Sequence, residues 1–200
     1  MKHVLLSLLS LCLFFSTASA QRVLLETETG RIVLELYADK APGTVANFLR
    51  YVDDKRYDGA TFYRVVRLDN QANSPVKIEV IQGGLRTDTT RMFPPIAQET
   101  TQKTGLKHLD GTLSMARGTP ASGASEFFIC INPQPELDFG GKRNPDGQGF
   151  AAFGRVIEGM DVVRKIQQGE TGQPGPTNAY SNPTQLLKAP VLIRTAKRVK

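Results

Sequence analysis

The sequence predicts a mostly β domain that carries two α-helices. Short segments rich in β-branched and aromatic residues recur along the 200-residue chain, separated by Gly, Pro, Asn and Asp. Such spacing is typical of all-β domains. One segment alternates its side chains with a period of two, and two other stretches repeat apolar residues with helical spacing. These patterns predict the strands and helices but not how the strands close into a sheet.

The first two predicted strands, Val23–Glu26 and Arg31–Leu36, form a hairpin around Gly30. The second has aliphatic side chains at every other position, Ile32, Leu34 and Leu36. This period of two indicates one buried face. Six more strands are expected at 61–68, 77–82, 112–116, 127–131, 152–157 and 190–196.

The first predicted helix begins at Pro42, because proline is favoured in the first helical turn. Its apolar stripe consists of Val45, Phe48, Leu49 and Val52. The second helix starts near Met160 and ends by Gly169. The Gly-, Pro- and Asn-rich segments 138–149 and 169–183 are either ordered loops or mobile flaps.

The N-terminus is typical of a secretory signal peptide. Lys2 precedes an apolar run from Val4 to Phe15, and Ala18-Ser19-Ala20 follows as a small-residue cleavage site. A membrane anchor is the alternative, but the run is shorter than the roughly 20 residues that span a bilayer. We therefore expect residues 1–20 to be removed and 21–200 to form one domain, exported without stable membrane insertion: periplasmic in a Gram-negative bacterium, otherwise secreted.

The chain is basic, with 25 Lys and Arg against 19 Asp and Glu, a net charge of +6. Much of the excess lies at the C-terminus, in Arg194, Lys197, Arg198 and Lys200. Such a run is expected as a solvated strand edge or tail, with a surface for anionic partners as the alternative. We expect a monomer that binds no nucleic acid.

Beyond residues 1–20 the sequence contains one cysteine, Cys130, and one histidine, His108. One cysteine cannot form an internal disulfide, and its apolar neighbours predict a buried small hydrophobe. Neither residue type is frequent enough for a metal site. His108 could serve a serine triad, but it lies in a polar turn and no G-x-S-x-G motif is present. Acid–base and metal chemistry are therefore poorly provided for, and no cofactor is expected.

Four segments of the chain resemble the motifs of a known protein family. They read T-F-Y-R-V-V (Thr61–Val66), V-I-Q-G-G (Val80–Gly84), L-S-M-A-R (Leu113–Arg117) and S-E-F-F-I (Ser125–Ile129). In this order they resemble the cyclophilin family of peptidyl-prolyl cis-trans isomerases, and the agreement extends from about Val23 to Ala196. The pattern is most similar to exported bacterial cyclophilins.

The resemblance implies a closed antiparallel eight-stranded β-barrel capped by two α-helices. It also implies a cofactor-independent prolyl isomerase that accelerates X–Pro rotation in unfolded or flexible exported polypeptides and so assists their folding. The alternative is a cyclophilin-like module that binds proline-containing peptides, or acts as a chaperone, with little turnover. An exported hydrolase is a third reading, for which the sequence offers no nucleophile or carboxylate pair.

The resemblance also implies the site. Rotation of an X–Pro bond must overcome the partial double bond of the amide, about 18–20 kcal/mol, without a nucleophile or a proton transfer. Arg64 matches the family arginine that donates to the prolyl nitrogen. Gln82 matches the glutamine that positions this arginine and the substrate backbone. The remaining expected substrate-binding residues are Val80, Ala116, Arg117, Glu126, Phe128, Leu137 and Phe150; Phe128 matches the pocket floor, and by strand alternation Phe127 faces the other way.

Several positions depart from the family pattern. Glu126 replaces a glutamine, so a contact with substrate becomes anionic, and a pairing with Arg64 or Arg117 is open. Glu136 falls where animal cyclophilins carry a tryptophan that contacts cyclosporin. Residues 68–77 are an insertion, and Glu79 falls near a missing pocket aromatic, so Phe93 or Phe150 is expected to supply that wall.

Overall fold

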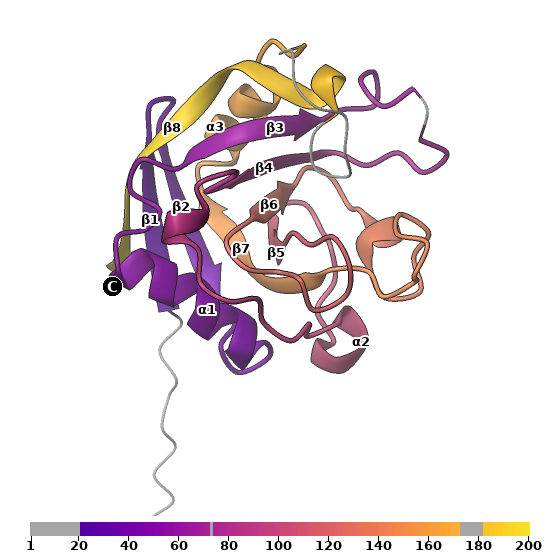
Figure 1. Cartoon of the computed structure of the whole chain (residues 1–200), viewed down its shortest axis with the longest axis horizontal. Helices are drawn as coiled ribbons and strands as arrows, with labels where there is room; N and C mark the ends of the chain where they lie inside the picture. The colour runs from indigo at the N-terminus through magenta and orange to yellow at the C-terminus, as the bar shows by residue number, and fades with distance from the viewer. Residues whose placement is uncertain (1–20, 73, 173–181) are drawn as a thin grey trace, which may run out of the picture.

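The computed structural model describes residues 21–72, 74–172 and 182–200, so the predicted signal peptide and most of segment 169–183 lie outside the described residues. The described chain forms a closed antiparallel barrel with the strand order β1-β2-β7-β5-β6-β4-β3-β8 (Figure 1). The strands are β1 Gln21–Thr27, β2 Arg31–Leu36, β3 Thr61–Val66, β4 Val80–Gly84, β5 Thr112–Met115, β6 Phe127–Cys130, β7 Ala151–Glu158 and β8 Leu186–Val199. The predicted barrel is confirmed.

The largest differences from the predicted strands concern β4 and β8. Strand β4 begins at Val80 rather than Lys77, because the inserted segment extends almost to the strand. Strand β8 starts at Leu186 and pairs with both β1 and β3. The C-terminal basic residues therefore do not lie on a free strand edge, and two of them, Lys197 and Arg198, form ion pairs with Glu26 and Asp53.

The two predicted helices are present, as α1 Pro42–Asp53 and α3 Met160–Gln167. They lie on opposite sides of the barrel (Figure 1). The structure adds a single helical turn, α2 Thr101–Thr104, and the 3₁₀ turns η1 Thr89–Arg91, η2 Pro135–Leu137 and η3 Pro183–Gln185. No helix among the described residues is long and apolar enough to cross a bilayer.

The buried apolar side chains form two clusters, one inside the barrel and one on its outer face. The larger fills the interior, where Phe48 from α1 packs against the rings of Tyr57, Phe127 and Phe153 at 5.2–5.4 Å. The smaller lies on the outer face and contains Val66, Ile78, Val80, Ala116, Phe128, Cys130 and Leu137, with Phe150 packed against it. Phe127 and Phe128 thus face opposite sides, as predicted, and Cys130 is buried. The outer cluster surrounds the candidate site.

Candidate active site

The predicted site residues come together because four strands place them in one cross-strand row. Arg64 on β3 lies opposite Gln82 on β4, Gln82 lies opposite Phe128 on β6, and Phe128 lies opposite Ser114 on β5. Side chains in register on neighbouring strands point to the same face of a sheet. Segments far apart in sequence therefore supply adjacent side chains on the outer face of the barrel.

A β-bulge in β3 turns Arg64 toward this face. With strict alternation, Phe62 and Arg64 would share a face. The register shifts between these two residues, so that Phe62 pairs with Gly83 while Arg64 pairs with Gln82. Phe62 is then fully buried in the barrel interior, and Arg64 lies outside it. Bulges redirect side chains in this way next to functional sites.

Two glutamines hold the guanidinium of Arg64. Its Nη1 donates to Oε1 of Gln82 at 2.7 Å, while Nε and Nη2 both donate to Oε1 of Gln185 at 3.0 and 2.6 Å. Because each terminal nitrogen carries two hydrogens, one N–H on each has no partner among the described residues and is available to a ligand. Burial lowers the pKa of Arg64 to about 10. The group therefore stays protonated at neutral pH while much of its water is excluded.

A hydrogen-bonded chain orients Gln82 in turn. Its Nε2 donates to the hydroxyl of Tyr63 at 2.7 Å, and that hydroxyl donates to Oε2 of Glu126 at 2.5 Å. Oε1 of Glu126 accepts from the backbone N–H of Arg86 at 2.8 Å. An ionised carboxylate only accepts, so it fixes the direction of the whole chain and aims Oε1 of Gln82 at Arg64.

This chain corrects the prediction for Glu126. Within the described residues Glu126 pairs with neither Arg64 nor Arg117, and it does not line the cavity beside them. Burial raises the pKa of Glu126, and the hydrogen bond from Tyr63 opposes that rise. Glu126 is therefore the terminal acceptor of the chain that runs through Tyr63 and Gln82.

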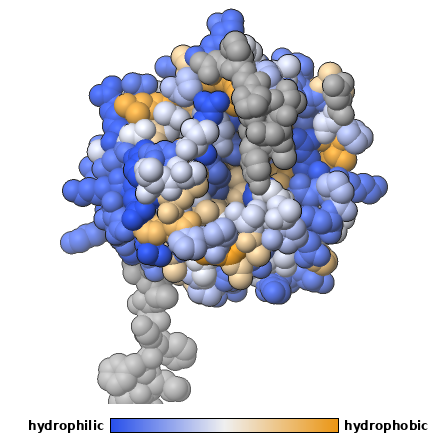
Figure 2. Space-filling view, in the orientation of Figure 1, coloured by the Kyte–Doolittle hydropathy of each residue, from blue (hydrophilic) through white to orange (hydrophobic). Residues whose placement is uncertain are grey.

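The row borders a cavity of about 530 Å³ with an apolar floor. The ring of Phe150 meets that of Phe128 edge-on, with centroids 5.2 Å apart. Ile78, Val80, Ala116 and Leu137 complete the apolar lining. Figure 2 shows this lining as pale orange atoms in the hollow near the centre of the face, with polar residues around it.

Of the two expected replacements for the missing aromatic wall, the structure selects Phe150. Phe93 lies instead in the barrel core, and the guanidinium carbons of Arg50 and Arg56 lie 3.5 and 3.8 Å from its ring centre. Ile78, directly after the insertion, adds a wall that sequence analysis missed. The insertion thus leads into the cavity lining.

The polar rim comes from two loops. Arg117 donates from Nη1 and Nη2 to the two carboxylate oxygens of Asp146 at 2.7 and 2.8 Å, and from Nε to the carbonyl of Gly149 at 2.8 Å. These bonds order segment 138–149 beside the cavity and neutralise the charge of Arg117. Sequence analysis missed the other rim residues, Gly118, Thr119, Ser122, Arg143, Asn144 and Pro145.

His108, predicted to lie in a polar turn, is only 1% exposed. Its Nδ1 lies 2.7 Å from Oδ1 of Asp138 and its Nε2 lies 2.9 Å from Oγ of Ser114. This is the order of a serine triad, yet Ser114 is fully buried and does not line the cavity, so no substrate reaches its hydroxyl. The imidazole stacks on Phe128 with ring centres 6.0 Å apart, so it supports the cavity floor.

Comparison with known proteins agrees with this arrangement. A family model described as cyclophilin type peptidyl-prolyl cis-trans isomerase/CLD matches residues 22–194. Peptidyl-prolyl cis-trans isomerase A of Dickeya dadantii is 35% identical, over 98% of this chain and 93% of that protein. Peptidyl-prolyl cis-trans isomerase B of Escherichia coli is 36% identical, over 76% of this chain and 88% of that protein.

A solved structure shares the fold. The cyclophilin type isomerase of Cryptosporidium parvum, determined in the presence of the dipeptide Ala-Pro, superposes with a TM-score of 0.65 and 21% identity, covering 90% of this chain and 99% of that one. The family match covers nearly all of the described residues, and it includes all four motifs that form the row and the rim. The chain belongs to the cyclophilin-type peptidyl-prolyl cis-trans isomerases, a family that needs no cofactor.

Proposed function

We propose that Arg64 is the catalytic donor of this isomerase and that the adjacent cavity receives the proline ring of a polypeptide. One observation carries the proposal: a guanidinium with two unused N–H groups stands beside an apolar cavity on the same sheet face. The cavity floor, Phe128, lies on the row that begins at Arg64. A fixed cation next to a hydrophobic hole is what a twisted prolyl amide requires.

The chemistry follows from the electronic change during rotation. As the amide twists, the nitrogen lone pair leaves conjugation with the carbonyl and becomes a hydrogen-bond acceptor. A donor aimed at that nitrogen then binds the twisted form more strongly than either planar form, and this difference lowers the barrier. Gln82 and Gln185 hold Arg64 before substrate arrives, so its alignment costs little reorganisation during the reaction.

The other expected site residues have supporting roles in this proposal. Val80, Leu137 and Phe150 enclose the proline ring above Phe128, and Ala116 and Arg117 form the edge along which the preceding residues lie. Glu126 acts through Tyr63 and Gln82 rather than by touching the substrate, so it is a positioning residue.

We propose further that the substrates are unfolded or flexible exported polypeptides, because slow X–Pro rotation, about 10–100 s at 25 °C, limits folding. Support comes from the predicted signal peptide at residues 1–20. Cleavage after Ala20 would leave Gln21, the first residue of β1, as the new N-terminus. N-terminal sequencing of the protein recovered from the periplasm or the medium tests this; an intact Met1 would contradict it.

A turnover assay on residues 21–200 separates catalysis from mere binding. Exchange NMR on a neutral Ala-Pro peptide measures the cis–trans rate directly and does not depend on a coupling protease. We expect acceleration that is proportional to the enzyme concentration and insensitive to chelators. Saturable peptide binding without acceleration would instead favour the proline-binding module.

A further inference from the structure

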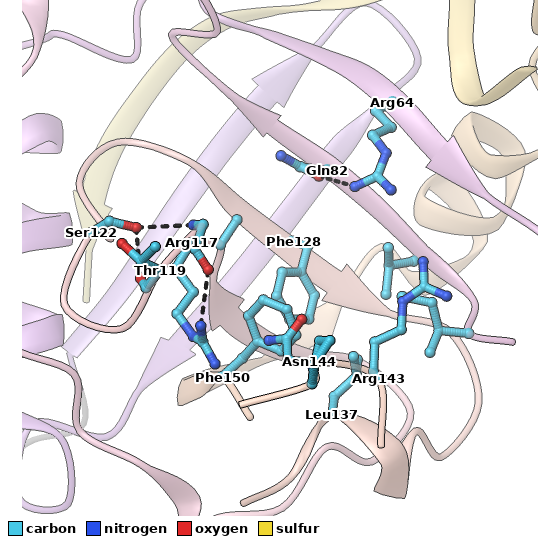
Figure 3. A pocket seen from close by; sticks show the side chains of 15 residues that line it. Arg64, Gln82, Arg117, Thr119, Ser122, Phe128, Leu137, Arg143, Asn144 and Phe150 are labelled. Atoms are coloured by element: carbon cyan, nitrogen blue, oxygen red, sulfur yellow. Dashed lines mark hydrogen bonds between the residues drawn. The ribbon is translucent and has the colours of Figure 1, made fainter. Parts of the chain in front are cut away.

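A second guanidinium, that of Arg143, lines the cavity, and the acceptors that it contacts among the described residues are all neutral. Its Nη1 lies 3.2 Å from Oε1 of Gln71, 2.6 Å from Oγ of Ser74 and 2.6 Å from the carbonyl of Val76. All three acceptors belong to the inserted loop between β3 and β4. Arg143 itself comes from the loop after η2, so its hydrogen bonds connect that loop to the inserted loop. Figure 3 shows its side chain at the cavity.

The charge of Arg143 is not neutralised within the part of the chain that the structure describes. Arg117, in the same cavity, forms a bidentate ion pair with Asp146, whereas Arg143 forms none, and its Nε and Nη2 have no partner there. Burial lowers the pKa of Arg143, and its positive charge contributes to the lowered pKa of Arg64. A partly buried guanidinium without a carboxylate is costly unless a ligand supplies one.

A neighbouring donor is also unused. Nδ2 of Asn144 is buried and has no hydrogen-bond partner among the described residues, although buried polar groups are normally paired. Asn144 lines the cavity directly after Arg143. Arg143 offers the unpaired N–H groups of Nε and Nη2 at the cavity, so the chemistry that would satisfy it is an anionic acceptor. A guanidinium binds a carboxylate with two parallel hydrogen bonds.

We infer that Arg143, with Asn144 beside it, binds a carboxylate side chain of the substrate, one or two residues after the proline. This inference rests on the proposed function, in which the residues before the proline lie along Ala116 and Arg117. Figure 3 places Arg117 on one side of Phe128 and Arg143 on the other, so the chain leaving the proline pocket passes Arg143. The enzyme would then favour Pro-Glu and Pro-Asp segments over neutral ones.

Four peptides test the inference, each acetylated and amidated so that a side chain is the only carboxylate. They carry Ala-Pro-Ala, Ala-Pro-Gln, Ala-Pro-Glu or Glu-Pro-Ala in a neutral frame. We expect kcat/KM for Ala-Pro-Glu to exceed that for Ala-Pro-Gln by about fivefold at low salt, as one ion pair supplies. The preference should shrink as salt screens the pair, and Glu-Pro-Ala should show none.

Three variants test whether Arg143 causes the preference for glutamate after proline. Arg143→Gln should reduce the ratio of Glu to Gln peptides to near one, and Arg143→Lys should keep part of it because the charge remains. Arg155→Gln removes an exposed arginine that pairs with Glu35 on the far wall of the barrel and should keep the full ratio. Because each variant is judged by a ratio of two peptides, a general loss of fold or turnover does not imitate the result.

Two outcomes would overturn the inference, and a third concerns the proposed function instead. Equal kcat/KM for Ala-Pro-Glu and Ala-Pro-Gln in the wild type would show that Arg143 does not bind a carboxylate after proline. A preference for Glu-Pro-Ala would place the carboxylate on the wrong side. If none of the four peptides, including Ala-Pro-Ala, were turned over, the proposed catalytic site would fail rather than the specificity assigned to Arg143.

Discussion

Gln185 accepts two hydrogen bonds from Arg64, although the two residues are 121 positions apart in the sequence. Its amide oxygen lies 3.0 Å from Nε and 2.6 Å from Nη2, and its own Nε2 donates to the carbonyl of Asn70 at 3.3 Å. The guanidinium is therefore clamped from two sides, by Gln185 and by Gln82. The turn before β8 positions Arg64 as much as the neighbouring strand does.

Loss of this clamp should reduce catalysis. In Gln185→Leu, Arg64 keeps one fixed contact and samples orientations that do not point at the prolyl nitrogen. We expect kcat to fall about threefold to tenfold, equivalent to roughly 0.7–1.4 kcal/mol, with a smaller change in KM. Gln134→Leu is a matched control, because this buried glutamine donates to the carbonyl of Ile131 and does not contact Arg64. Equal effects of both variants on kcat would refute a specific role for Gln185.

The raised pKa of Glu126 predicts a pH-dependent stability. Because burial makes the folded protein bind this proton more tightly than the unfolded chain does, the resulting stabilisation is complete below the usual value of 4.5. It is lost as pH rises through the folded value. Relative to Glu126→Gln, the wild type should therefore lose stability as pH rises above 4.5. Denaturant unfolding of both proteins from pH 4 to 8 measures this, and parallel curves would contradict the assignment.

The buried His108 should support the pocket without transferring protons. His108→Gln removes the ring that stacks on Phe128, so we expect a higher KM and lower stability. The pH profile of kcat/KM between 6 and 8 should nevertheless keep its shape, because rotation of the X–Pro bond needs no proton transfer. A bell-shaped wild-type profile that disappears in His108→Gln would indicate acid–base catalysis.

Cyclosporin should bind this protein weakly. Glu136 is the residue that the resemblance places where animal cyclophilins carry the tryptophan that contacts the drug. It lies in η2 outside the cavity lining, and its Oε2 accepts from the backbone N–H of Lys142 at 2.8 Å. The carboxylate offers no ring to the drug and is costly to desolvate. Glu136→Trp should tighten inhibition in a drug titration, with Glu170→Trp as a surface control. Stoichiometric inhibition of the wild type would show that the alignment at this loop is wrong.

The sequence motifs predicted the row Arg64, Gln82 and Phe128 because each member lies inside a strand whose neighbours are recognisable. The bulge at Tyr63 was not predictable from alternation, since a period of two places Phe62 and Arg64 on the same face. The two pairings left open for Glu126, with Arg64 or Arg117, do not occur among the described residues. Its partner Tyr63 lies 63 positions away in the sequence, which no local pattern indicates.

The rest of the site depends on contacts between loops. Gln185 reaches Arg64 through a turn with no motif of its own, and Arg143 meets Gln71 across two segments that depart from the family pattern. Local periodicity carries no information about such pairs. One signal was present: an insertion next to a missing pocket aromatic suggests a rebuilt wall, and Ile78, directly after the insertion, lines the cavity.

The most direct test of the account is the turnover of Arg64→Ala on a neutral Ala-Pro peptide, measured by exchange NMR beside the wild type. Arg64→Lys serves as the charge-preserving variant, and a thermal unfolding curve confirms that each protein is folded. We expect kcat/KM of Arg64→Ala to fall at least tenfold, a loss of about 1.4 kcal/mol of transition-state stabilisation, while folding changes little. An unaltered kcat/KM in folded Arg64→Ala would contradict the account.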